Sequence, residues 1–446
     1  MPCKNIVEEK IMKKVHSAGR VIWLIVGCFI ASAACAEAVV GEKDARLIQA
    51  AEKGRLSEVQ TLLAEGADVH ATSIKKYFGI FGKEVTPLIV AAENGHAEIV
   101  RLLLGKGASP SKSRVPDKAT ALMLAAENGH GDVLKILLDA GSDINAKDNN
   151  GSTALIMASK NGHREIVRLL LEKKIDLNIK NNDNVTALML ASQNGHKAVV
   201  QSLLQRGADV NLKNNDGVTA LMMAAKSSHA ETVGLLLDQG AAVNTQRSSD
   251  NATALMMAAE NGHKEIVSLL LNKGADVNLK TKYTGGTALM LASVKGYPEI
   301  VRLLIDKKAD VNAKNSTGST ALMAASLNGR TAVVHLLLDQ GAEVNAKTNE
   351  RATALMMAAE RGHAEIVKLL LDRGSDINAK NSDGVTSLMA AAEKGHTEVV
   401  RLLLDKGVDL NVKAKIKDVE YTPLQIAKQN RRADIVDLLQ KAGARE

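Results

Sequence analysis

Aromatic side chains are nearly missing from this chain of 446 residues, which holds one Trp, three Phe and four Tyr. Hydrophobic residues still make up 46% of the sequence, so the apolar core has to consist mainly of Leu, Ala, Val, Ile and Met. These side chains suit the packing of helices, whereas β-sheets favour aromatic and β-branched residues. The composition therefore argues against an aromatic-rich sheet protein and predicts an all-α fold.

Cysteine is restricted to the start of the chain, at Cys3, Cys28 and Cys35. The rest of the sequence has no thiol, which excludes disulfide bonds and cysteine chemistry from that part. The sequence also lacks an HExxH or CxxC motif, a Cys/His cluster, a phosphate-binding loop and a Ser/His/Asp arrangement. We therefore expect no enzymatic activity, no metal site and no cofactor.

Basic residues are not concentrated in any stretch after the start of the chain. The net charge is +7, of which residues 1–36 contribute +3 through five basic and two acidic side chains. The following 410 residues therefore carry only +4 (7 − 3). A nucleic-acid-binding surface requires a cluster of basic residues, so we do not expect a nucleic-acid partner.

One apolar run covers residues 21–36, follows Lys13, Lys14 and Arg20, and ends in Ala-Cys-Ala. This order of basic, apolar and small residues predicts a signal peptide over residues 1–36 and export, with a periplasmic or secreted product. Translation could also begin at Met12, which would shorten the signal.

Two other interpretations of this segment stay open. Residues 21–36 could anchor the chain in a membrane, although this run of 16 residues is short against the roughly 20 that span a bilayer. Alternatively, Cys28 or Cys35 could carry a lipid, because each follows a short apolar and small-residue sequence.

An internal repeat covers the rest of the chain. A Thr followed by Ala, Pro or Ser and then Leu recurs at steps of 33 to 36 residues, and an earlier unit without the Thr aligns with it, which makes twelve units over about 42–443. A chain of this length exceeds the roughly 250–300 residues of a single core, and a repeat array removes the need for one. The recurring residues are Thr86, Thr120, Thr153, Thr186, Thr219, Thr253, Thr287, Thr320, Thr353, Thr386 and Thr422.

One unit shows how each repeat is expected to fold. Thr120 is placed to cap a first helix, and Gly129 is placed to end it in a left-handed conformation. A second helix is expected over residues 132–139, with Gly141 after it and a polar turn over residues 145–151. The apolar spacing predicts that these helices bury Leu122, Ala125, Ala126, Val133, Ile136 and Leu137.

Residues 120–151, TALMLAAENGHGDVLKILLDAGSDINAKDNNG, resemble the ankyrin repeat. The resemblance implies an ankyrin-repeat solenoid of stacked antiparallel helix pairs with hairpin-like loops. It also implies a protein partner bound by the loop tips and the concave first-helix face, and we expect a monomer. The sequence departs from the family in one respect: Met, Ile or Gln stands three residues after each Thr, where the family favours His.

The repeats predict one array over residues 37–446. We divide it into an N-terminal cap (42–73), an aromatic insertion (74–82), inner repeats (83–413) and a C-terminal cap (414–446). Polar terminal units are typical of solenoids, which need them to stay soluble.

Two groups of residues are candidates for partner binding. The insertion carries Tyr77, Phe78 and Phe81, which form an apolar loop that could bind a partner or cover the first unit. The second group precedes or follows the glycine that ends a first helix, and units eight and nine stand out because Tyr297 and Arg330 replace a recurring His. This group comprises Lys160, Lys226, Val294, Lys295, Tyr297, Leu327, Asn328, Arg330, Glu360 and Arg361.

The recurring His, as at His96 and His130, is interpreted as structural, because equivalent residues lie too far apart to share a metal ion. Three positions predict local strain, since Lys174, Lys308 and Ser228 stand where other units have glycine. The favoured function is a non-enzymatic binding scaffold in the cell envelope or outside the cell. The alternative is a membrane-associated structural protein, tethered by the N-terminal segment or the 74–82 loop.

Overall fold

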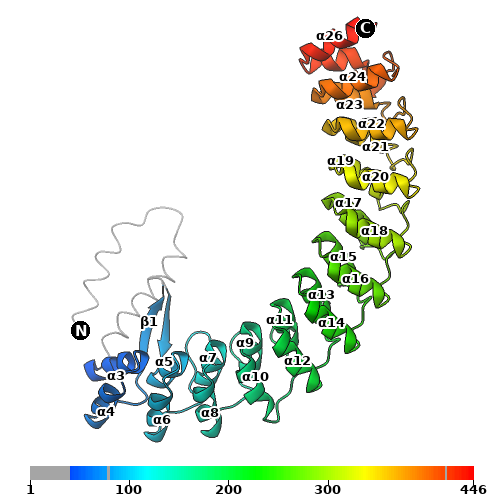
Figure 1. Cartoon of the computed structure of the whole chain (residues 1–446). Coiled ribbons are helices and arrows are strands. Elements are labelled where there is room, and N and C mark those ends of the chain that lie inside the picture. Colours follow the sequence, from blue (N-terminus) through cyan, green and yellow to red (C-terminus); the bar gives the residue numbers. More distant parts are fainter. Residues whose placement is uncertain (1–40, 78–80, 417–418, 446) are drawn as a thin grey trace, which may run out of the picture. The chain divides into compact units, whose positions relative to one another are not determined.

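The computed structural model describes residues 41–77, 81–416 and 419–445, which form 24 helices and four short strands (Figure 1). The described residues divide into two compact units, with the boundary between Ala187 and Leu188. The expected signal peptide over residues 1–36 lies outside the described residues. Within the described ranges, no helix combines the length and the apolar character that a membrane span requires.

The first unit consists of helix pairs whose first helices pack on one another in the order α3, α5, α7, α9, while the second helices pack as α4, α6, α8, α10. The bounds are α3 Glu42–Glu52, α4 Leu56–Ala64, β1 Ser73–Tyr77, β2 Phe81–Val85, α5 Pro87–Glu93, α6 Ala97–Gly105, α7 Ala121–Asn128, α8 Gly131–Asp139, α9 Ala154–Asn161 and α10 Arg164–Leu171.

The second unit repeats this arrangement from α11, which begins at the unit boundary, to α26. The bounds are α11 Ala187–Gln193, α12 Lys197–Gln205, α13 Ala220–Lys226, α14 Ala230–Asp238, α15 Ala254–Glu260, α16 Lys264–Asn272, α17 Ala288–Lys295, α18 Pro298–Asp306, α19 Ala321–Leu327, α20 Thr331–Asp339, α21 Ala354–Arg361, α22 Ala364–Asp372, α23 Ser387–Lys394, α24 Thr397–Asp405, β3 Ala414–Ile416, β4 Val419–Tyr421, α25 Pro423–Gln429 and α26 Ala433–Lys441. The odd-numbered helices from α13 to α25 pack on one another in one row, and the even-numbered helices from α12 to α26 pack on one another in a second row. Both units therefore confirm the predicted fold of paired helices.

The recurring Thr begins the first helix of a repeat, as its spacing predicted. Thr120 Oγ1 accepts a hydrogen bond from Met123 N at 3.3 Å, and Gly129 ends the helix with φ = 80°. A cap of this kind satisfies one of the backbone N–H groups that a helix start leaves free. The same cap is formed by Thr86, Thr153, Thr219, Thr253, Thr287, Thr320, Thr353, Thr386 and Thr422.

The core lies between the two rows of helices. All residues from Ala121 to Ala126 are buried, because this first helix contacts its own second helix and the first helices on both sides. The second helix buries only one stripe, formed by Val133, Leu134 and Leu137. Ile136, which was expected to point inward, is only half-buried. The buried stripe of this helix is therefore rotated by part of a turn from the expected one, because Leu134 is buried in place of Ile136.

Each unit also has one antiparallel hairpin, at the places where the repeat spacing is longest. Strands β1 and β2 pair from Ser73–Val85 to Tyr77–Phe81, and β3 pairs with β4 in the second unit. In the first unit the hairpin stands beside α3 and α5 (Figure 1), and a further bridge joins Glu84 to Val115. Phe78 lies outside the described residues, as do the side chains of Tyr77 and Phe81, so the binding role of this insertion stays a prediction.

Two of the three positions predicted to be strained do adopt the left-handed conformation. Ser228 and Lys308 each have φ = 68°. The prediction for Lys174 is wrong: α10 ends at Leu171, its C-cap Glu172 is right-handed, and Lys174 is not left-handed. Helix α10 ends three residues before position 174, whereas α8 ends two residues before Gly141. The longer connection lets the chain turn at position 174 without a left-handed residue.

Candidate partner-binding site

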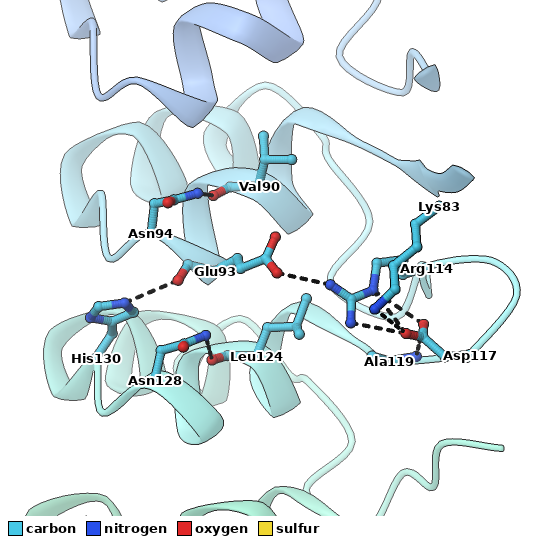
Figure 2. A network of polar contacts seen from close by, with 10 residues as sticks. All are labelled: Lys83, Val90, Glu93, Asn94, Arg114, Asp117, Ala119, Leu124, Asn128 and His130. Carbon is cyan, nitrogen blue, oxygen red and sulfur yellow. Dashed lines mark hydrogen bonds and ion pairs between the residues drawn. The ribbon is translucent and has the colours of Figure 1, made fainter. Parts of the chain in front are cut away.

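The recurring His at the start of the second helix joins each repeat to the preceding one. His130 Nε2 lies 3.1 Å from the carbonyl oxygen of Glu93, which is the last residue of α5 (Figure 2). A Cβ atom on Gly95 would lie 2.6 Å from His130 Nδ1, so the ring packs against a glycine backbone. Equivalent bonds are made by His96, His163, His229, His263, His363 and His396. The interpretation of these residues as structural is thus supported.

Tyr297 and Arg330 occupy the same place as this His in units eight and nine. Arg330 Nε donates to the carbonyl oxygen of Val294 at 3.0 Å, as a His would. The ring of Tyr297 packs on Gly262, where a Cβ atom would come within 2.8 Å of Cζ. The structure therefore gives both residues a role in joining repeats, and their role in binding stays a prediction.

The other candidates cluster at the carboxyl ends of the first helices. Their backbones are fixed, because the carbonyl oxygens of Lys226, Val294, Leu327 and Glu360 accept the bonds from the following repeat. Val294, Leu327 and Glu360 are half-buried, whereas the remaining five are exposed: Lys160, Lys226, Lys295, Asn328 and Arg361. Along the second unit these positions form one row of neighbouring repeats, with side chains of both charges and two apolar ones. This row could hold a partner without disturbing the stack.

A buried ion network fixes the loop before α7 in the first unit (Figure 2). The side chain of Arg114 is only 6% exposed. Its Nε and Nη2 donate to the carboxylate of Asp117 at 3.1 and 2.9 Å, and its Nη1 donates to Glu93 Oε1 at 2.9 Å. Lys83 Nζ also lies 3.0 Å from Asp117 Oδ2. Burial raises the pKa of Asp117, but the hydrogen bonds from Arg114 and Lys83 outweigh it, so the pKa lies below its ordinary value.

A related loop before α15 borders a pocket of about 310 Å³ in the second unit. Arg247 Nε donates to Asp250 Oδ1 at 2.8 Å, and its Nη2 also bonds this carboxylate. Those hydrogen bonds raise the pKa of Arg247 and lower that of Asp250. The pocket lies among the ends of α13 and α15, the middle of α17 and the loops before α15 and α17.

Tyr283, in the loop before α17, was not predicted as a binding residue. Its side chain is 69% exposed and lines the pocket, and Lys282 Nζ lies 5.2 Å from the ring centroid. Within the described ranges, the other exposed large hydrophobic residues are Val115 and Val419. Two sequence signals could have identified Tyr283: the scarcity of aromatics, and the extra residue in its repeat.

The part of the chain that the structure describes holds no group of three or more His, Cys, Asp or Glu residues placed for a metal ion.

Comparison with known families agrees with this architecture. A model of ankyrin repeats (three copies) matches residues 47–148, 141–214, 207–281, 278–348 and 355–445. No curated protein matches the chain. Because the family model covers most of the sequence, the chain belongs to the ankyrin-repeat family, whose arrays serve as scaffolds for protein–protein interaction.

Proposed function

We propose that this protein is a non-enzymatic scaffold, exported from the cytoplasm, that holds a protein partner on its loops and on the ends of its first helices. One observation carries the proposal. The carbonyl groups at these helix ends accept hydrogen bonds from a His or from Arg330 of the next repeat, while side chains such as Lys226 and Arg361 remain exposed. A rigid backbone with exposed side chains loses little conformational entropy when a partner binds.

The charge of this row favours a polypeptide over a polyanion. The residues seven positions after the recurring Thr differ in charge and polarity from repeat to repeat. In five successive repeats they are Lys226, Glu260, Val294, Leu327 and Glu360. A nucleic acid would meet two carboxylates in this row, whereas a polypeptide can match both signs and cover the apolar pair. The second-helix side is less suitable, because charged side chains there pair with each other, as Lys264 does with Glu299 at 2.8 Å.

Export is proposed from the basic, apolar and small residues within residues 1–36. Fractionation of the source cell, followed by mass spectrometry of the mature amino terminus, tests this part. We expect the protein in the envelope or the medium with Glu37 as its first residue. An intact amino terminus in the membrane fraction would instead support a tethered structural protein.

The binding function is tested by cross-linking the tagged full chain in its source cell and reconstituting the captured protein with it. Charge reversals Lys295→Glu and Arg361→Glu should each weaken the purified complex by about tenfold. The control is Gln201→Glu on the second helix α12, which should leave the affinity unchanged. Equal effects of all three substitutions would contradict binding by the first-helix ends.

A further inference from the structure

The two loops that contain Arg114 and Arg247 are built in the same way. In each, an Arg binds the carboxylate of the Asp three residues later. That Asp also accepts a hydrogen bond from the backbone N–H two residues further on, in Ala119 or Ala252. The first loop therefore serves as an internal reference for the second.

The reference loop has a third member that the second loop lacks. Glu93 is the last residue of α5, stands 21 residues before Arg114 and binds its Nη1 at 2.9 Å. The equivalent residue, 21 positions before Arg247 and last in α13, is Lys226. Among the described residues, Nη1 of Arg247 has no hydrogen-bond partner, and this side chain is 28% exposed compared with 6% for Arg114.

Where the first unit has a carboxylate beside its Arg, the second unit therefore has a second cation. Lys226 and Arg247 both line the pocket of about 310 Å³, and no ion pair of Lys226 is found in the described part of the chain. Apolar contact area is also available in this pocket, since Met257, Leu291 and the exposed Tyr283 are among its lining residues. Such a pocket suits a short segment with an acidic and an apolar side chain next to each other.

Three carboxylates limit how much negative charge the pocket can accept. Asp250 is already bound to Arg247, Asp216 Oδ2 lies 3.8 Å from Arg247 Nε, and Glu260 lines the pocket. A ligand with several phosphate groups would bring its negative charges close to all three carboxylates. A single carboxylate is favourable only where it contacts both cations directly, at the place that Glu93 takes in the reference loop.

We propose that this pocket binds an acidic side chain of the partner polypeptide between Lys226 and Arg247, with an adjacent apolar side chain packed on Tyr283. The proposal rests on the scaffold function and specifies the partner's chemistry. The carboxylate would receive charge-assisted hydrogen bonds from both cations, and the ring would supply a rigid apolar contact of the kind that dominates protein interfaces.

The test is the selection of short random peptides, displayed on phage, against the full chain. We expect the selected peptides to share an Asp or Glu next to an aromatic or large aliphatic residue. Lys226→Glu should weaken their binding by at least about tenfold, because it supplies the missing carboxylate from the chain itself. Tyr283→Ala should weaken binding by about tenfold as well.

Lys135→Glu is the charge-matched control, since Lys135 is exposed on the second helix α8 and belongs to neither group of binding candidates. It should leave peptide affinity unchanged, and circular dichroism should show native helix content in all three variants. Peptides that bind Lys226→Glu as tightly as the parent would overturn this pocket and leave the scaffold function standing. Recovery of no binding peptide at all would contradict both.

Discussion

The backbone of Gly95 lies against the imidazole of His130 in the next repeat, so close that a Cβ atom on Gly95 would come within 2.6 Å of Nδ1. The same glycine has φ = 80°, which most side chains avoid. Gly129 and His163 repeat this relationship, as do Gly362 and His396. The glycine thus ends one helix and makes room for the ring that binds its repeat to the next.

Gly95→Ala should therefore cost more stability than an ordinary replacement of a left-handed glycine. We expect the left-handed conformation to cost about 1 kcal/mol and the contact with His130 at least about as much again. Urea unfolding of Gly95→Ala and of the control Gly107→Ala measures how much stability each substitution costs. Gly107 has φ = 92° but no atom within 4 Å of the place where a Cβ would lie, so this control carries the conformational cost alone. Equal losses in the two variants would show that the ring does not resist the methyl group.

His130→Ala should lower the free energy of unfolding by about 1 kcal/mol, because it removes the hydrogen bond to Glu93 O. His130→Arg should lose less, since Arg330 and Arg432 make the same kind of bond through Nε. The control is His335→Ala on α20, whose exposed side chain forms a hydrogen bond with Asp339 in its own helix. We expect that change to stay within about 0.5 kcal/mol. A comparable loss for His335→Ala would contradict the structural role of the row.

Lys308→Gly and Ser228→Gly should each raise the thermal stability, because both native residues hold φ = 68°. A non-glycine residue in this region costs roughly 1 kcal/mol. Lys174→Gly serves as the control, since Lys174 is not left-handed and the new glycine only gains freedom in the unfolded chain. Differential scanning calorimetry should show higher midpoints for the first two variants and no increase for the third. A higher midpoint for Lys174→Gly alone would contradict the predicted strain at Lys308 and Ser228.

Asp117→Asn should destabilise the first unit by about 2 kcal/mol at neutral pH, because it removes one of the two carboxylates that bind the buried Arg114. A carboxyl whose folded pKa is lowered stabilises the fold above its unfolded pKa, near 3.9, and this contribution is lost as the pH falls through the folded pKa. The difference between the variant and the parent should therefore shrink below about pH 4. Chemical unfolding at several pH values measures it, with exposed Asp132→Asn as the control. A difference independent of pH would rule out the ionic origin.

The sequence predicted the features that depend on local chemistry and on the repeat. Thr120 and Gly129 marked the ends of a helix because capping and left-handed geometry need particular residue types. The prediction for Lys174 was wrong because it assumed the same helix length in every repeat. The ionic contact of Arg114 with Glu93 was missed because it joins two repeats across 21 residues, which no periodic pattern indicates. Lys226 stands where Glu93 stands in the first unit, and this difference gains a meaning only once the contact of Glu93 with Arg114 is known.

The central claim, that a partner binds at the first-helix ends, is tested most directly by photocross-linking in the source cell. A benzophenone amino acid is placed in the full chain at Lys226 or Tyr283, which line the pocket, and at the exposed Gln201 on the second helix α12. We predict one discrete cross-linked polypeptide from each of the first two positions and none from Gln201. No product from the pocket positions, or the same product from all three, would contradict the claim.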